Sequence, residues 1–256
     1  MAERIALVRP PSPRMADGLV THIERTPVDA KLAERQHEAY VDALEAHGWT
    51  IREVPLALNL PDSAFVEDTV VVVDRLAVLT NPGAPERQAE VKGTEEVIRA
   101  LRLDIARIEP PGTLDGGDVL QVGSTVYVGR GGRTNDEGIR QLADHLQPLN
   151  RTVVTVPLKS VLHLKSAITA LPDGTIVGAD PTQLDATRLP PIRRVVEPGG
   201  SHVVVLDDHT ILMATSAPQT KQRYEADGLD VVAVDISEFE KMEGCVTCLS
   251  VLVPGG

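Results

Sequence analysis

The chain has 256 residues, 42% of them hydrophobic and 24% charged, which is typical of a globular protein with a sizeable core. The formal net charge of −12 argues against nucleic acid as a partner, because binding to phosphates needs Lys and Arg. We expect a cytoplasmic protein without a membrane partner, since no apolar run approaches the roughly 20 residues that span a bilayer and the start of the chain has no signal-peptide pattern.

The predicted elements begin with a strand over 5–8, a helix over 31–47 and a strand over 50–54. From there the order of hairpin, helix and strand recurs four times. The predicted hairpins cover 64–80, 118–128, 163–177 and 202–213; the helices cover 85–101, 135–146 and 219–226; the strands cover 105–108, 152–156, 194–196 and 230–234. Pro190-Pro191 breaks the helix of the fourth unit.

A period of roughly 45–50 residues indicates a repeat architecture. Helices alternating with strands also fit a doubly wound sheet, but the first strand runs into Pro10-Pro11 and lacks the glycine fingerprint of a dinucleotide-binding fold. The first unit lacks one hairpin strand, which the final run, 248–253, could supply. We therefore predict an α/β protein, a five-bladed α/β propeller of ββαβ modules with pseudo-fivefold symmetry, in which 1–256 form a single catalytic domain.

Residues with catalytic chemistry stand at matching places in these units. Asp68, Asp115, His163 and Cys248 each precede or open the first strand of a unit, so in a ring they would face one another. Taken singly, each has a structural interpretation: a strand-end hydrogen bonder, a turn, a core histidine and a small buried hydrophobe. Four such residues at equivalent repeat positions favour a shared site.

The two cysteines, Cys245 and Cys248, form a CxxC motif. This spacing suits inert packing, a redox pair or half of a zinc site. A thiol at the entry to a strand is also a candidate nucleophile if a His and a carboxylate serve it. The motif by itself leaves these alternatives open.

Six stretches of the sequence together resemble one enzyme family: FVEDTVVV, NPGAPERQ, LDGGDVL, VGRGGRTNDEG, HLKS and EGCVTCLSVL. The family is that of the dimethylarginine dimethylaminohydrolases, the dimethylargininase branch of the guanidino-modifying enzymes. The resemblance runs from about residue 35 to the C-terminus, and it implies the five-bladed α/β propeller. The implied reaction converts Nω-methylated arginines to citrulline and the methylated amine, in arginine metabolism related to nitric oxide.

The resemblance also implies roles for individual residues. It makes Cys248, two residues before Ser250, the nucleophile rather than Cys245, His163 the general acid and base, and Asp115 the catalytic carboxylate. Arg87 and Arg133 would hold the substrate's α-carboxylate. The full set of implied substrate contacts is Leu19, Asp62, Phe65, Glu67, Asp68, Arg87, Arg133, Met242 and Glu243.

The chemistry agrees with these roles. A guanidinium is a planar cation best held by carboxylates, here Asp68 and Asp115, and attack needs the thiolate of Cys248. No cofactor and no metal is required, although zinc could bind Cys248 and inhibit. We expect a small-molecule substrate and a monomer or homodimer.

Two rival functions remain. Deiminases that act on unmethylated guanidino compounds carry an Asp two residues after the catalytic His, where this chain has Lys165. The other rival is a non-catalytic propeller that binds cationic amino acids, against which the complete set of Cys248, His163 and Asp115 argues.

Overall fold

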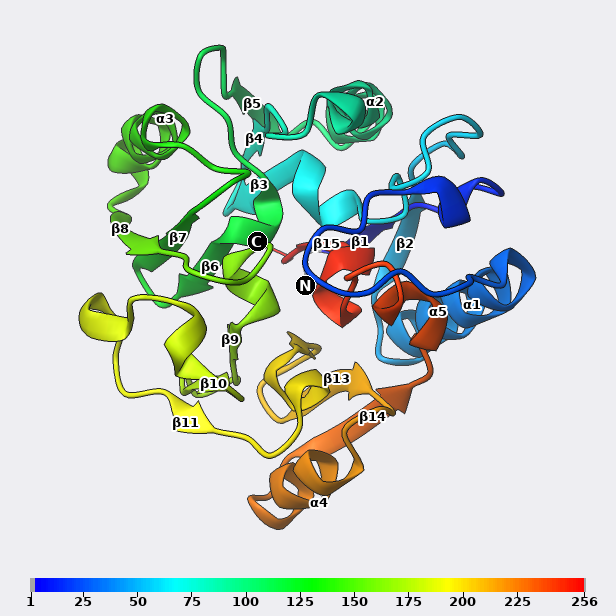
Figure 1. Cartoon of the computed structure of the whole chain (residues 1–256). Helices are drawn as coiled ribbons and strands as arrows, with labels where there is room; N and C mark the ends of the chain where they lie inside the picture. The colour runs from blue at the N-terminus through cyan, green and yellow to red at the C-terminus, as the bar shows by residue number, and fades with distance from the viewer. Residues whose placement is uncertain (1–2, 256) are drawn as a thin grey trace.

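The computed structural model describes residues 3–255, and within that range fifteen strands form five three-stranded sheets. Each sheet holds two antiparallel neighbours and a third strand parallel to the central one. The sheets stand around a common axis, with one blade for each predicted module (Figure 1). The predicted five-bladed α/β propeller is therefore confirmed.

The blades follow chain order, with one exception at the first blade. The sheets are β15-β1-β2, β3-β4-β5, β6-β7-β8, β9-β10-β11 and β12-β13-β14. Their bounds are β1 Ile5–Val8, β2 Thr50–Glu53, β3 Val70–Val73, β4 Leu76–Leu79, β5 Asp104–Arg107, β6 Val119–Val122, β7 Thr125–Arg130, β8 Thr152–Pro157, β9 Ile168–Ala170, β10 Ile176–Gly178, β11 Arg193–Arg194, β12 Val203–Val205, β13 Thr210–Ala214, β14 Asp230–Val234 and β15 Val251–Val253.

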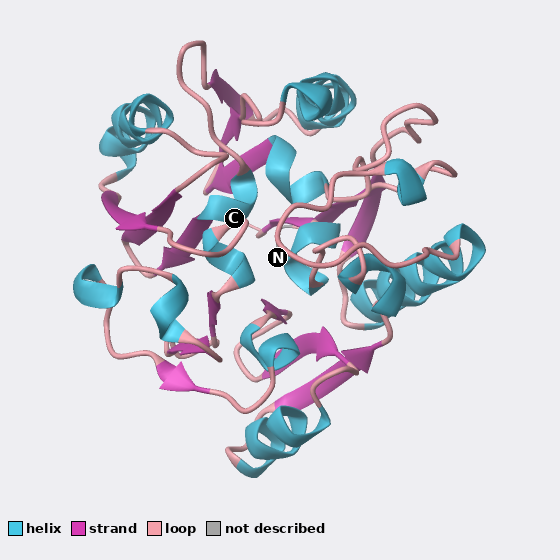
Figure 2. Cartoon of the chain, in the orientation of Figure 1, coloured by secondary structure: helices cyan, strands magenta, loops and turns pink. Residues whose placement is uncertain are grey.

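Four α-helices lie at the outer rim, each between the second and third strand of its blade (Figure 2). They are α1 Ala30–Ala46, α2 Val91–Ala100, α3 Asp136–Leu146 and α4 Pro218–Ala226, and a short helix α5, Ser237–Glu240, follows the fifth blade. In the fourth blade, 3-10 turns at Pro181–Gln183 and Ala186–Arg188 replace the helix, as the following prolines predict. Within residues 3–255, no helix combines the length and the apolar character needed to cross a membrane.

The two ends of the chain close the ring. β15 pairs antiparallel with β1, with Ile5 opposite Val253, while β2 pairs parallel on the other side of β1. The predicted supply of the missing hairpin strand by the final run is thus confirmed. Tyr40 of α1 fixes this closure, because its buried hydroxyl donates to the Val246 carbonyl at 2.9 Å and lies 2.8 Å from Ser250 Oγ.

The hydrophobic core consists of five clusters, each between two neighbouring blades. Strand β3 shows the arrangement: Val70 and Val72 pack toward the first blade, and Val71 and Val73 pack toward the third. Successive side chains of a strand point to opposite faces. Because both faces are covered, the strand is an unbroken run of valines rather than an alternating pattern.

The predicted hairpins begin too early in the sequence. Short 3-10 turns occupy Val66–Thr69, Gly116–Asp118 and Leu164–Ser166, and the strands start after them. These turns are fixed by bonds between blades: the Gly117 N–H donates to Asp68 Oδ1 and the Leu164 N–H donates to Asp118 Oδ1, each at 2.9 Å. A periodicity within one segment cannot show such bonds. The predicted helix over 85–101 likewise begins as a 3-10 turn, Pro85–Glu90.

The closure of the ring can be tested at Tyr40. Tyr40→Phe leaves a buried carbonyl and a buried hydroxyl without their partner, so we expect a loss of about 1–3 kcal/mol in the free energy of unfolding, measured by urea denaturation. Tyr127→Phe is the control, since Tyr127 is also buried but its hydroxyl makes no hydrogen bond among the described residues. Equal stability of the two variants would contradict the role of Tyr40.

Candidate active site

Five short 3-10 turns precede the innermost strands of the five sheets. They are Val66–Thr69, Gly116–Asp118, Leu164–Ser166, Pro198–Ser201 and Val246–Leu249. Because each turn leads into the same strand of its sheet, the turns gather near the axis at one end of the ring (Figure 1). This arrangement brings together side chains from four different blades.

A small pocket lies among these turns. It is lined by Leu19, Asp62, Phe65, Asp68, Arg87, Arg133, Leu162, His163, Met242, Glu243, Gly244 and Cys248. Ten of the twelve residues singled out from the sequence are in this lining. The two others, Asp115 and Glu67, lie beside it rather than in its wall.

Asp115 lies behind His163 and is fully buried. Its Oδ2 is 2.9 Å from His163 Nε2, and its Oδ1 accepts the Gly83 N–H at 2.8 Å. Burial alone would lower the pKa of His163, but the charge of Asp68 and the hydrogen bond that the imidazole donates to Asp115 outweigh burial and raise it to about 9. This imidazole therefore carries a proton at neutral pH.

Asp68 presents an ionised carboxylate to the pocket. Its Oδ1 accepts the Gly117 N–H at 2.9 Å, and its Oδ2 accepts from Arg87 Nη1 at 2.5 Å. Burial opposes ionisation, yet His163 and Arg87 lower the pKa of this carboxyl to about 2. His163 Nδ1 is 3.9 Å from Asp68 Oδ1, so one imidazole lies between two carboxylates.

The two arginines of the pocket differ in how they are held. Arg87 is buried, and all three of its guanidinium nitrogens are engaged, with Asp68 in front and Glu90 behind. Its Nη2 donates to Glu90 Oε2 at 2.7 Å and to the Phe65 carbonyl at 3.1 Å. Within residues 3–255, the Arg133 guanidinium makes one looser ionic contact, 3.6 Å from Nη1 to Asp115 Oδ2. Arg133 is thus the freer cation for a ligand.

Cys248 belongs to the turn that enters β15. Its side chain is buried, and its Sγ accepts the Cys245 N–H at 3.4 Å and lies 3.3 Å from Cys245 Sγ. Contact with the second thiol, burial and the charges of Glu67 and Asp68 raise the pKa of Cys248 well above its usual value. A nearby cation is therefore needed to stabilise its thiolate.

A segment of the N-terminal loop covers the pocket and is fastened at two points. The Leu19 N–H donates to Asp62 Oδ1 at 3.0 Å. Glu243 Oε1 accepts the N–H groups of Thr21 and Ile23, at 3.0 and 2.9 Å. Three residues of the pocket lining, Leu19, Asp62 and Glu243, thereby also position the loop above it.

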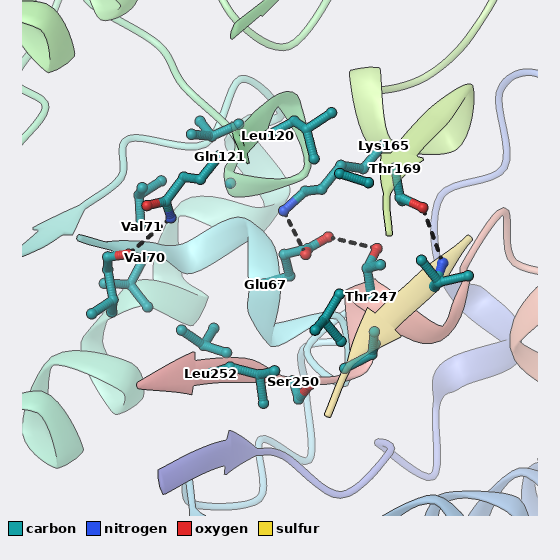
Figure 3. Close-up of a pocket in the computed structure, with 18 residues that line it drawn as sticks. Glu67, Val70, Val71, Leu120, Gln121, Lys165, Thr169, Thr247, Ser250 and Leu252 are labelled. Atoms are coloured by element: carbon teal, nitrogen blue, oxygen red, sulfur yellow. Dashed lines mark hydrogen bonds and ion pairs between the residues drawn. The ribbon is translucent and has the colours of Figure 1, made fainter. Parts of the chain in front are cut away.

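Glu67 faces a second space, the axial cavity, which lies among the innermost strands of all five blades and has a volume of about 240 Å³. Figure 3 shows its carboxylate between Lys165 and Thr247. Lys165 Nζ donates to Glu67 Oε1 at 2.6 Å, and Thr247 Oγ1 donates to Oε2 at 3.2 Å. Lys165 also lines this cavity and not the pocket, so its ammonium is turned away from the pocket.

Two positioning residues, Asp118 and Glu90, were missed by the sequence interpretation. Asp118 accepts from Thr134 Oγ1 at 2.6 Å and from the N–H that follows His163. Glu90 holds Arg87. Two signals were available: Asp118 is the second acid of the LDGGD stretch, and Glu90 stands three residues after Arg87, a spacing at which helical side chains meet.

Asp68, Asp115 and His163 are close enough to share a cation, since one ligand atom from each lies within 4.8 Å of the others. Their oxygens already accept from Arg87 and from two backbone N–H groups. The three side chains therefore fit a network of ion pairs and hydrogen bonds better than a metal site. Inhibition by zinc bound to Cys248 stays a prediction.

Comparison with known proteins identifies the family. A family model described as arginine deiminase matches residues 15–188. The dimethylarginine dimethylaminohydrolase of Streptomyces coelicolor is 54% identical over 98% of this chain and 97% of its own, and that of Pseudomonas aeruginosa is 33% identical over 95% and 97%. The chain belongs to the dimethylarginine dimethylaminohydrolase family.

Solved structures agree with this membership. The Pseudomonas aeruginosa enzyme of this family, as a cysteine-to-serine mutant complexed with citrulline, has a TM-score of 0.90 at 30% identity and covers 98% of this chain and 99% of its own. A histidine-to-glycine variant of a dimethylarginine dimethylaminohydrolase, as the adduct with S-methyl-L-thiocitrulline, also has a TM-score of 0.90 at 30% identity and covers 98% of this chain and 100% of its own. The N-terminal domain of a cyanobacterial arginine dihydrolase shares the fold at 19% identity, with a TM-score of 0.83 over 99% of both chains.

Gly117 allows Asp68 and His163 to approach each other, because a Cβ at this position would lie 2.7 Å from Asp68 Oδ1 and 2.7 Å from His163 Nδ1. We expect Gly117→Ala to displace both side chains and to lower kcat/KM by about 100-fold. Gly132→Ala is the matched control, since a Cβ there would meet nothing within 4 Å. Steady-state kinetics of both variants test this, and an unimpaired Gly117→Ala enzyme would contradict it.

Proposed function

We propose that this chain hydrolyses Nω-methylated arginines, both dimethyl- and monomethylarginine, to citrulline and di- or monomethylamine, as a hydrolase acting on the C–N bonds of linear amidines. The observation that carries the proposal is the buried pocket in which a thiol, a protonated imidazole and an ionised carboxylate converge. Family membership agrees with it, and relatives bearing this enzyme name bind citrulline or form a thiocitrulline adduct.

The substrate's two ends would be held by opposite charges. Asp68 would accept N–H bonds from the guanidinium, because a carboxylate fixed by Arg87 and Gly117 needs no rearrangement to receive a cation. Arg133 would form an ion pair with the substrate's α-carboxylate. Arg87, which lies beneath Asp68, would add to the positive charge around that carboxylate. Phe65, Met242 and the loop fastened by Asp62 and Glu243 would exclude water.

Attack begins at Cys248. Its raised pKa means that the thiol is protonated in the empty site, so the bound guanidinium would supply the cation that stabilises the thiolate. As the cation binds, the thiol proton is released to water, and the thiolate then attacks the guanidinium carbon and gives a tetrahedral adduct. Cys248 would thus be activated mainly when substrate is present.

His163 would then move protons twice. Protonated at neutral pH, it gives a proton to the departing methylamine, which leaves an S-alkylthiouronium on Cys248. The neutral imidazole next takes a proton from water, which attacks the same carbon and releases citrulline. Asp115 would hold the ring in position and stabilise its charged form, in the manner of the acid in a catalytic triad.

The rival activity, deimination of free arginine, is disfavoured by Lys165. An acid at this position would accept N–H bonds from an unsubstituted nitrogen, and a dimethylated nitrogen would leave that acid unpaired. Here Lys165 is paired with Glu67 on the far side of the turns. Methylated substrates therefore suffer no such penalty, while arginine would leave its N–H groups without a strong acceptor.

The proposal extends to the setting of the enzyme. We propose that residues 1–256 act as one catalytic domain, as a monomer or homodimer in the cytoplasm, without a cofactor, in arginine metabolism related to nitric oxide. The net charge of −12 argues against nucleic acid as a partner.

The decisive experiment offers dimethylarginine, monomethylarginine, arginine and agmatine to the enzyme in competition and follows citrulline and free amines. We expect methylated arginines to exceed arginine in kcat/KM by roughly 5- to 150-fold, the discrimination that an unmatched buried group provides. Agmatine should be poorest, because it has no carboxylate for Arg133. Cys248→Ser should be folded and inactive on all four. Equal or better use of arginine would replace the proposal with the deiminase.

The roles of the two arginines can be separated. The resemblance implies that both arginines bind the substrate's α-carboxylate. The contacts of Arg87 predict instead that Arg87→Ala lowers kcat. The variant should also lose about 3–5 kcal/mol in the free energy of unfolding, because it leaves Asp68 and Glu90 buried and unpaired. Arg133→Ala should mainly raise KM. Arg87→Lys retains the charge but not the forked geometry, so it should fold better than Arg87→Ala and still lose kcat. Unchanged kcat in both Arg87 variants would overturn the distinction.

A further inference from the structure

Cys245 has no part in the proposed reaction, yet it touches the nucleophile. Both cysteines are free, and their Sγ atoms lie 3.3 Å apart. Cys245 is the residue before the turn Val246–Leu249, and the Cys248 N–H donates to the Cys245 carbonyl at 3.1 Å. The CxxC motif seen in the sequence is therefore a real pair of thiols in van der Waals contact.

The backbone permits a disulfide at this position. Residues three apart in a 3-10 turn are separated by about 6 Å, because such a turn has three residues and rises about 2 Å per residue. Disulfides join Cα atoms about 4.4–6.8 Å apart. Rotation of the two side chains is enough to bring Sγ atoms now 3.3 Å apart into bonding distance, without movement of the blades.

The two thiols differ in access. Both thiols pack in the core cluster between the fifth and first blades, but only Cys248 also lines the substrate pocket. Cys245 Sγ also lies 3.2 Å from Thr247 Oγ1. A small oxidant that enters the pocket meets Cys248 first, with Cys245 directly behind it.

We propose that Cys248 and Cys245 are a redox-sensitive pair, in which a hydroperoxide oxidises Cys248 and Cys245 then closes a disulfide that stops hydrolysis. The Cys248 sulfur attacks one oxygen of hydrogen peroxide while its thiol proton passes to the other oxygen, the O–O bond breaks, water leaves, and Cys248 becomes a sulfenic acid. The Cys245 sulfur then attacks the Cys248 sulfur of the sulfenic acid. The S–O bond breaks, and a second water leaves with the proton of Cys245.

In total, two thiols and one hydrogen peroxide give one disulfide and two waters. The two cysteines supply both electrons that reduce the peroxide. A dithiol reductant restores the two thiols by exchange. While the disulfide exists, Cys248 has no free thiolate to attack a guanidinium. The bond also protects the nucleophile, because a sulfenic acid without a neighbouring thiol is oxidised further to the irreversible sulfinic acid.

The test uses the full-length protein and hydrogen peroxide in small molar excess, followed by alkylation of free thiols, intact mass and citrulline formation. In the wild type we expect at least a tenfold loss of rate, a mass lower by about 2 Da, no alkylation, and full recovery of rate and mass with dithiothreitol. Citrulline at saturating concentration should slow the reaction, since it fills the route to Cys248. If the oxidised protein still has two thiols that can be alkylated, the proposed disulfide is wrong. If citrulline does not slow the inactivation by peroxide, the proposed route through the pocket is wrong.

Cys245→Ser is the matched variant, with Cys245→Ala as a second replacement for the buried site. Either should turn over substrate at close to the wild-type rate before oxidation. After peroxide they should gain about 16 or 32 Da instead of losing about 2, and dithiothreitol should fail to restore the sulfinic fraction. If they recover as completely as the wild type, Cys245 has no resolving role. Mass and thiol count are independent of turnover, so they separate failure of this proposal from failure of the proposed hydrolase activity.

Discussion

The buried ion pair between Asp68 and Arg87 is the interaction on which the site depends. A carboxylate removed from water becomes protonated unless it is paired and hydrogen-bonded. Here Arg87 and the Gly117 N–H supply that compensation, and Glu90 in turn balances Arg87. The result is a fixed negative charge in a buried pocket, which is suited to receive a guanidinium and keeps the neighbouring imidazole charged.

The propeller makes this network possible because it places equivalent turns side by side. Each 3-10 turn enters an innermost strand, and side chains from one turn accept backbone N–H groups of the next, as Asp68 does from Gly117 and Asp118 from Leu164. The last link depends on closure of the ring, since β15 joins β1 and carries Cys248 into the same pocket. The position of Cys248 in the pocket therefore depends on closure of the ring.

The layer of turns has two sides with different chemistry. On one side lies the pocket with Asp68, His163 and Cys248; on the other lies the axial cavity with the Glu67–Lys165 pair. Burial raises the pKa of Glu67 to about 7 although Lys165 opposes this, so its charge depends on that partner. Lys165 pairs with Glu67 on the cavity side, so this position places no acid in the pocket. Such an acid would be left without a hydrogen-bond donor by a methylated substrate nitrogen.

The sequence by itself determined the number of blades and nearly every strand and rim helix. Local signals suffice there: apolar periodicity marks the elements, Asp173-Gly174 marks a turn, and the repeat places Asp68, Asp115, His163 and Cys248 at equivalent positions. The other pocket residues were implied by the resemblance to a known family and not by local signals.

Tertiary structure alone decided what each of these residues touches. It put Asp115 behind His163, engaged Arg87 on both sides, turned Glu67 and Lys165 into the axial cavity, and set Cys245 against Cys248. The physical reason is that bonds between blades join residues far apart in the sequence, such as Asp115 and His163, 48 positions apart, and Glu67 and Thr247, 180 positions apart. No pattern within one segment records which partner across the axis satisfies a buried charge.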